Sequence, residues 1–253
     1  MAKMMFKIPV LESQQCHHVI QKINGDPIPI YNQILSLCDE SVNYFWLGRQ
    51  SFQPVWELQK MIHNARVENR IPDVVLLLEH DPVYTFGKNA NRDHLLPSYS
   101  KDADVISIDR GGDVTFHGPG QLIVYPILNL RDYRQSVSWY MRSLEEVVIL
   151  TLKEFGIESH IREGMTGVWI DDEKICAMGV RLSRWVSMHG LALNLDTDLA
   201  YFNGIIPCGI FECGVTSLNE QTRHDISMPQ LMESFMKAFK AVIQPTLAKC
   251  EEL

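Results

Sequence analysis

Apolar residues recur at helical spacing in three segments of the chain. These segments predict amphipathic helices over residues 52–68, 137–155 and 228–242. Gly156 follows the second helix as its expected C-cap, and Ser227 precedes the third as its expected N-cap. The helices lie in different parts of the chain, so the segments between them decide the fold class.

Between the helices the pattern changes to short β-branched and apolar runs, which are typical of strands. Strands are predicted over residues 73–78, 83–86, 105–108, 121–128, 167–170, 174–182 and 189–194. The last three are separated by short turns and predict an antiparallel meander. We therefore expect an α/β or α+β domain rather than a doubly wound sheet. Residues 1–41 lack clear periodicity and are interpreted as an extension of unknown role, packed on or loose from a domain of residues 42–253.

Composition limits the classes of function. Of the 253 residues 46% are apolar and 21% are charged, as in ordinary globular proteins, and the net charge of −8 argues against nucleic acid as a main partner. No apolar run approaches the roughly 20 residues that span a bilayer, so we expect no membrane segment. Residues 1–7 resemble neither a secretory signal nor an organellar presequence, so a cytoplasmic protein is expected.

The six cysteines are scattered, which indicates reduced and mostly buried thiols. Cys208 and Cys213 have poor spacing for zinc and no second pair nearby, so no metal site is expected.

The glycine-rich segment 110–121 is the strongest site candidate. It contains four glycines and Pro119 between two predicted strands, and it carries Arg110 and His117. We predict a loop whose backbone N–H groups are exposed and which a ligand can approach closely.

Two further residues could carry chemistry. Cys208 lies in a turn between Pro207 and Gly209, where a thiol is accessible and a nearby cation would favour the thiolate. Taken alone, these residues favour a structural role for the cysteine. Lys174 begins an apolar strand, where it either extends to water or points into a pocket and, being buried, carries protons. Strand alternation places Lys174, Cys176 and Met178 on one face, so Cys176 remains a rival thiol.

Several ordered segments together closely resemble the lipoyl(octanoyl) transferase family. The resemblance runs from about residue 42 to 243 and rests on residues 79–87, 110–121, 167–170, 174–179, 189–194 and 207–210. It implies a single lipoate/biotin ligase-like domain with a mixed central sheet and flanking helices. It also implies transfer of an octanoyl group from acyl carrier protein, through an enzyme cysteine, to a lysine of lipoyl domains. The implied acceptors are the 2-oxoacid dehydrogenases and the glycine-cleavage H protein. No cofactor of the enzyme is implied, because the donor protein carries the phosphopantetheine.

The resemblance also assigns residues. It matches Cys208 to the acyl-bearing cysteine and Lys174 to its acid/base partner. The implied substrate contacts are His80, Arg110, Gly111, Gly112, Asp113, Val114, Thr115, Phe116, His117, Ala177, Met178, Gly179, Gly190, Leu191 and Ala192.

The expected chemistry needs no ATP, because exchange between two thioesters is nearly balanced. We expect Lys174 to stabilise the Cys208 thiolate and later to accept the proton of the attacking lysine. Backbone N–H groups near Cys208 and in residues 177–179 are candidates for an oxyanion hole. Gly111 and Gly112 are expected to let the acyl tail run along the backbone.

Two alternatives remain at this point. An ATP-dependent lipoate or biotin ligase would share the fold but would need no nucleophilic cysteine. A non-catalytic lipoyl-domain binder would have no use for Lys174, His117 and Cys208 together.

Overall fold

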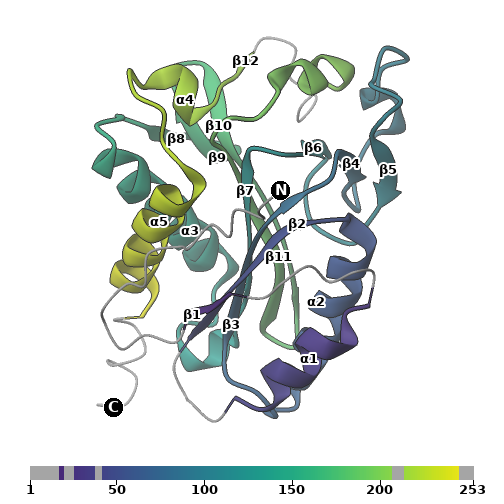
Figure 1. Cartoon of the computed structure of the whole chain (residues 1–253), viewed down its shortest axis with the longest axis vertical. Coiled ribbons are helices and arrows are strands. Elements are labelled where there is room, and N and C mark those ends of the chain that lie inside the picture. Colours follow the sequence, from purple (N-terminus) through teal and green to yellow (C-terminus); the bar gives the residue numbers. More distant parts are fainter. Residues whose placement is uncertain (1–16, 20–25, 38–41, 207–213, 245–253) are drawn as a thin grey trace, which may run out of the picture.

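A computed structural model of the chain describes residues 17–19, 26–37, 42–206 and 214–244. These residues form a large mixed sheet with helices on both faces and a small three-stranded sheet beside it (Figure 1). In spatial order, the large sheet contains β1 (His17–Val19), β2 (Asn43–Gln50), β3 (Val74–His80), β7 (Gln121–Ile127), β11 (Val186–Asn194), β10 (Glu173–Ser183), β9 (Met165–Ile170) and β8 (His160–Arg162), with β12 (Gly214–Val215) pairing with β10. The small sheet contains β5 (Asp104–Ser107), β4 (Val83–Phe86) and β6 (Val114–His117). The expected fold class is confirmed.

Helices cover the two faces of the large sheet in pairs. In Figure 1, α1 (Ile28–Leu35) and α2 (Phe52–Val67) lie on one side, and α3 (Val137–Glu154) and α5 (Met228–Ile243) lie on the other. Leu76 packs into the core on the α2 side, whereas its neighbour Leu77 packs into the core on the α3 side. Because β3 is buried on both faces, its sequence is continuously apolar instead of alternating. Shorter helical segments are η1 (Arg92–His94), η2 (Leu130–Asp132), η3 (Leu199–Gly204) and α4 (Leu218–Gln221).

The three helices predicted from periodicity are confirmed as α2, α3 and α5. The hydroxyl of Ser136 caps α3 by accepting a hydrogen bond from the backbone N–H of Trp139 at 3.2 Å. At the other end Gly156 has φ +76°, the left-handed conformation expected of a glycine after a helix. Ser227 and Gln230 form a capping box at the start of α5.

The antiparallel meander is confirmed as β9, β10 and β11. The prediction for residues 110–121 was wrong in one respect, because residues 114–117 form β6 and pair with β4. The glycines therefore flank a strand. The segment between them is paired with β4 instead of forming an open loop. β2 was not predicted, although it is an interior strand of the large sheet, between β1 and β3.

The part of residues 1–41 that the structure describes lies against the core. β1 pairs in parallel with β2, and α1 packs on α2 with Ile30 and Ile34 buried. A domain boundary at residue 42 stays a prediction.

A buried ion pair fastens α2 to the end of the sheet. Arg66 Nε lies 2.6 Å from Asp73 Oδ1, and the same guanidinium also contacts Asp132. Asp73 accepts two further hydrogen bonds, from the backbone N–H of Asn129 at 2.9 Å and from the Tyr133 hydroxyl at 2.6 Å. One carboxylate thus joins α2, β3 and the segment that leads into α3.

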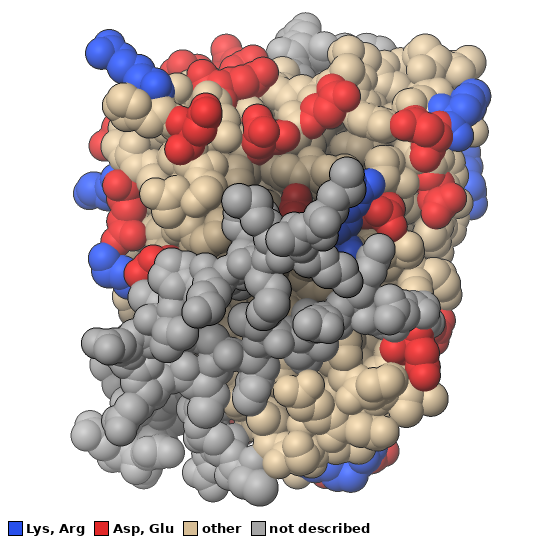
Figure 2. All heavy atoms as spheres, in the orientation of Figure 1, with Lys and Arg blue, Asp and Glu red and all other residues tan. Residues whose placement is uncertain are grey.

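The face drawn in Figure 2 carries more acidic than basic side chains among its described residues. Acidic side chains are spread over the upper half of the face in Figure 2, and basic side chains lie mainly at its edges. No helix of the described ranges is both long and apolar enough to cross a bilayer. Within the same ranges, no group of three or more His, Cys, Asp and Glu side chains is placed to hold a metal ion.

Candidate active site

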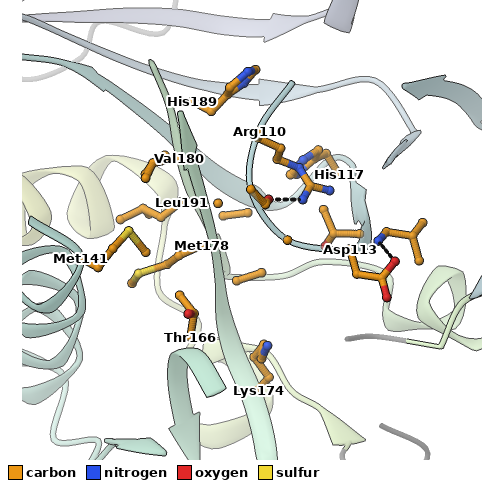
Figure 3. A pocket seen from close by; sticks show the side chains of 18 of the residues that line it. Arg110, Asp113, His117, Met141, Thr166, Lys174, Met178, Val180, His189 and Leu191 are labelled. Atoms are coloured by element: carbon orange, nitrogen blue, oxygen red, sulfur yellow. Dashed lines mark hydrogen bonds between the residues drawn. The ribbon is translucent and has the colours of Figure 1, made fainter. Parts of the chain in front are cut away.

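A cavity of about 540 Å³ lies between β10, the start of α3 and the segment that enters β6 (Figure 3). Its size falls in the range of small-molecule sites. Most of the residues that the family resemblance assigns to the site line this cavity: Arg110, Gly111, Gly112, Asp113, Val114, Thr115, His117, Lys174, Ala177, Met178, Gly179, Gly190, Leu191 and Ala192. Residues from three separate stretches of sequence therefore meet around one space.

The cavity exists because β9 separates from β10. Pairing between the two strands ends at Val168 and Cys176, and beyond this point the backbone N–H of Gly111 donates to the Val180 carbonyl at 3.0 Å. Backbone groups alternate between the two edges of a strand. The N–H and C=O of Met178 therefore point to the same edge as the Val180 carbonyl, toward the gap that β9 leaves.

Close backbone contacts hold residues 111–112 in place. Gly112 has φ +87°, which favours glycine. A Cβ on Gly179 would lie 2.7 Å from the Gly111 carbonyl oxygen, and one on Gly87 would lie 2.1 Å from the Gly112 oxygen. What approaches the backbone here is the loop itself, and the approach of an acyl tail stays a prediction.

Lys174 lies at the end of the cavity where β12 joins the sheet. The residue is only 8% exposed, and its Nζ lies 4.7 Å from the centroid of the Trp169 ring. The backbone carbonyl of Lys174 accepts a hydrogen bond from Thr216 N–H at 3.1 Å. Of the two readings of Lys174, the structure supports the one in which it lines a pocket.

Cys176 does not share this position, so the expected alternation of Lys174, Cys176 and Met178 on one face was wrong. A bulge interrupts the alternation, because Trp169 faces Lys174 while the next residue back, Val168, faces Cys176. Cys176 is fully buried in the core under α3 and α5, and burial raises the pKa of its thiol. Its thiol is therefore a poor nucleophile at neutral pH.

Cys208 lies outside the described residues, but both flanks of segment 207–213 are placed. On one side, the Ile206 N–H donates to the His94 carbonyl at 2.8 Å. On the other side, Gly214 and Val215 pair with Glu173 and Lys174. The segment thus leaves and re-enters the described structure beside the cavity, which Phe202 and Val215 help to line.

Two buried histidines stand on the Arg110 side. His117 lines the cavity, whereas His80 lies behind it, with ring centroids 6.0 Å apart. His80 Nδ1 donates to the Gln50 carbonyl at 3.0 Å, so its Nε2 accepts from the Tyr125 hydroxyl at 2.9 Å. Burial lowers the pKa of His80 to about 4 and that of His117 to about 3, the latter helped by the charge of His80. Both imidazoles are therefore neutral at physiological pH.

Phe116 does not line the cavity. Its ring is buried in the small sheet and stacks on Tyr201 with centroids 4.3 Å apart. Asp113 does line the cavity, but it also binds His94 and the backbone N–H of Asn91 at 3.2 Å. It links the Arg110 segment to the residues that hold Ile206.

Asp109 connects the Arg110 segment to strands β10 and β11 of the large sheet. Its carboxylate lies 2.7 Å from Arg181 Nη1 and 2.9 Å from His189 Nε2. His189 reaches this carboxylate from a strand position with φ +60°, and its own N–H donates to Gln59 Oε1 at 3.0 Å. Hydrogen bonding to His189 lowers the pKa of Asp109, so this carboxylate is charged at neutral pH, whereas burial lowers the pKa of His189.

The cavity also has an apolar side. Figure 3 shows Met141 of α3 beside Met178 and Leu191, on the opposite side of β10 from Arg110 and His117. Such a surface suits an alkyl chain.

Several of these residues had no signal in the sequence. Asp109, Tyr125 and Met141 lie outside every motif that the sequence offered as part of a site, whereas Gln121 and Asn194 each end such a motif and could have been noticed there.

Comparison with known proteins places the chain in a family. Residues 52–240 match the model of the lipoyl protein ligase A/B catalytic domain. The octanoyltransferase of Christiangramia forsetii is 44% identical over 222 residues, covering 79% of this chain and 95% of that protein. The octanoyltransferase of Synechococcus elongatus is 43% identical over 208 residues, covering 79% and 89%. The chain belongs to the octanoyltransferase family. It is an acyltransferase with a lipoyl protein ligase A/B catalytic domain.

Solved structures agree with this fold. A lipoate-protein ligase A bound with ATP superposes with a TM-score of 0.62 at 12% identity, covering 81% of this chain and 85% of that one. The bipartite lipoate protein ligase of Thermoplasma acidophilum gives 0.60 at 12% identity, covering 81% and 84%. At 12% identity, the likeness to these ligases shows a common fold and carries no conclusion about activity.

Proposed function

We propose that this enzyme takes an octanoyl group from the thioester of acyl carrier protein onto Cys208 and passes it to the lysine of a lipoyl domain. Lys174 acts as the acid and base in both halves. The cavity supports this proposal most directly, because it joins a buried lysine, an apolar side and a strand edge beside the flanks of Cys208. The enzyme needs no cofactor of its own.

In the first half-reaction the Cys208 thiolate attacks the thioester carbonyl and the carrier thiolate leaves. A charged Lys174 stabilises the attacking thiolate and then gives its proton to the leaving sulfur. The N–H of Met178 is a candidate oxyanion donor, since it points to the open edge of β10. Donors of this kind each contribute about 3–4 kcal/mol to lowering the barrier.

In the second half-reaction the ε-amine of the acceptor lysine attacks the Cys208 thioester. Such an amine has a pKa of about 10.4 in water and must lose a proton to react. Lys174, neutral after the first half, accepts that proton before the attack. The nitrogen loses a second proton to solvent as the amide forms and the Cys208 thiolate leaves. The atoms and charges balance without ATP.

Acyl carrier protein and lipoyl domains are the proposed partners, with the 2-oxoacid dehydrogenases and the glycine-cleavage H protein as acceptors. The chain carries a net charge of −8, and both partner classes are generally acidic. Docking therefore depends on local cations rather than on long-range attraction.

Intact-mass measurement after incubation with octanoyl-acyl carrier protein tests the proposal. The mass should rise by one octanoyl group that hydroxylamine removes. Cys208→Ala should abolish the adduct, and Cys176→Ala serves as the matched control and should retain it. The opposite pattern would assign the nucleophile to Cys176, and transfer that requires ATP and free octanoate would indicate a ligase.

Lys174 is tested by two substitutions. Lys174→Ala should slow both half-reactions. Lys174→Arg keeps a positive charge that does not dissociate, so it should retain more acylation than transfer to the acceptor. Equal loss of both half-reactions in Lys174→Arg would contradict the proton-transfer role.

A further inference from the structure

A chain of hydrogen bonds runs along the wall of the cavity from Arg110 to Thr216, the residue after β12. Arg110 Nη2 donates to the Thr85 hydroxyl at 3.0 Å, and this hydroxyl lies 3.4 Å from His117 Nε2. His117 Nδ1 lies 2.9 Å from Gln121 Oε1. Gln121 Nε2 donates to Asn194 Oδ1 at 2.8 Å, and Asn194 Nδ2 donates to the Thr216 carbonyl at 2.9 Å.

The two ends fix the direction of every link. A guanidinium can only donate and a backbone carbonyl can only accept. Asn194 must therefore present its NH₂ to Thr216 and its oxygen to Gln121. Gln121 must in turn present its NH₂ to Asn194, an orientation that its second contact, to the Phe116 carbonyl at 3.3 Å, also requires.

The tautomer of His117 follows from the same reasoning. Gln121 turns its oxygen to His117, so Nδ1 must carry the hydrogen. At the other end Arg110 donates to the Thr85 oxygen, which leaves the hydroxyl hydrogen for Nε2. Each group then donates in one direction, from Arg110 to Thr216, and such chains strengthen their own links.

We propose that Gln121 and Asn194 are positioning residues, which hold His117 as the neutral Nδ1–H imidazole by means of a one-way hydrogen-bond chain from Arg110 to the Thr216 carbonyl. Protonation of His117 would reverse the link to Thr85 and place a second cation beside Arg110. The ionisable groups around His117 are His80 of β3, Arg110 of the entering segment and His189 of β11, and all of them disfavour its charged form. The low pKa of His117 agrees with the geometry.

The chain connects the two polar ends of the cavity. Its last residue, Thr216, also donates its backbone N–H to the carbonyl of Lys174 at 3.1 Å. His117 and the Lys174 strand are thus joined through Gln121 and Asn194. Under the proposed function, both ring nitrogens of His117 are engaged within this chain, and the proton transfers are left to Lys174.

Nitrogen-15 NMR of the resting enzyme tests the tautomer directly, without substrate. His117 is assigned by loss of its signals in His117→Asn. At neutral pH, wild-type His117 should show a protonated Nδ1 and an unprotonated Nε2. His80, whose tautomer is fixed by the Gln50 carbonyl, provides the internal reference. A protonated Nε2, or an imidazolium, would overturn the proposal even if octanoyl transfer were demonstrated.

Gln121→Met removes the link while nearly preserving side-chain volume. It should mix the two neutral tautomers of His117 and lower kcat/KM about tenfold, as expected for a lost buried hydrogen bond. Gln121→Glu still accepts from Nδ1 but cannot donate to Asn194. It should raise the pKa of His117 and add an acid limb to the pH–rate profile. The control is Gln53→Met on the exposed surface of α2.

The result for Gln121→Met decides between positioning and mere packing. An unchanged tautomer and pH profile in a folded variant would refute the positioning role. If the variant fails to fold, the wild-type spectrum still decides the tautomer. Failure of the proposed function appears separately, as absence of the octanoyl adduct.

Discussion

Acidification should destabilise this enzyme through its buried histidines, and His80 allows the magnitude to be worked out. Its pKa is about 4 in the folded chain against 6.5 for the free side chain, because burial penalises the charged form. The unfolded chain therefore binds more protons at mildly acidic pH. The contribution of His80 is fully present above its unfolded pKa and is lost progressively as the pH falls toward 4. Between pH 7 and 5 the loss is about 2 kcal/mol.

Urea unfolding at pH 7 and pH 5, followed by tryptophan fluorescence, measures this loss. His80→Asn keeps a donor for the Gln50 carbonyl but has no proton to gain, so it should lose about 2 kcal/mol less than the wild type between the two pH values. The variant will be less stable at pH 7, and only the difference between pH values is informative. His224→Asn, an exchange of the same kind on the exposed surface, is the control. Equal losses in wild type and His80→Asn would refute the reasoning.

Three further outcomes are expected. Gly179→Ala should destabilise the fold by about 1–3 kcal/mol, because the added Cβ would lie 2.7 Å from the Gly111 carbonyl oxygen. The control is Gly111→Ala, whose added Cβ makes only an ordinary contact at 3.4 Å, so its melting temperature should stay close to that of the wild type. Asp73→Asn should lower the free energy of unfolding, measured in urea, by about 3 kcal/mol, because it leaves Arg66 buried with a weaker partner. The same exchange at Asp81, whose side chain is 47% exposed, should lower it by less than about 1 kcal/mol. Met141→Ala enlarges the apolar side of the cavity, so the relative kcat/KM for longer acyl groups should rise about fourfold per added methylene in competition assays. An unchanged acyl-length preference would mean that the acyl group binds elsewhere.

Elements with strong local signals could be predicted from the sequence, and elements defined by distant partners could not. The stripe in residues 137–155 together with Gly156 determines α3 almost by itself. β6 is different, because Val114–His117 becomes a strand only through pairing with β4, some thirty residues earlier in the chain. β2 was missed for a similar reason: its burial depends on neighbours contributed by β1 and β3.

The same distinction holds for the site. Arg110, His117 and Lys174 belong to motifs and could be named in advance, and the structure brings them around one cavity. The role of Asp109 depends on Arg181 and His189, which are distant in sequence. Lys174 and Cys176 were predicted to share one face of the strand, and this was wrong because period-two alternation assumes an uninterrupted strand. A bulge leaves little trace in a single sequence.

That irregularity has a consequence for how the enzyme tolerates change. Ile175 is the additional residue between two differently phased halves of β10, one carrying the amine of Lys174 and the other carrying residues 177–179. Deleting Ile175 would restore regular pairing with β9, and the side chains of one half of β10 would then point to the opposite face of the sheet relative to the other half. Either the side chain of Lys174 or residues 177–179 would then face away from the cavity that both now line. Insertions and deletions should accumulate in the turns of this meander and spare the three positions from 174 to 176.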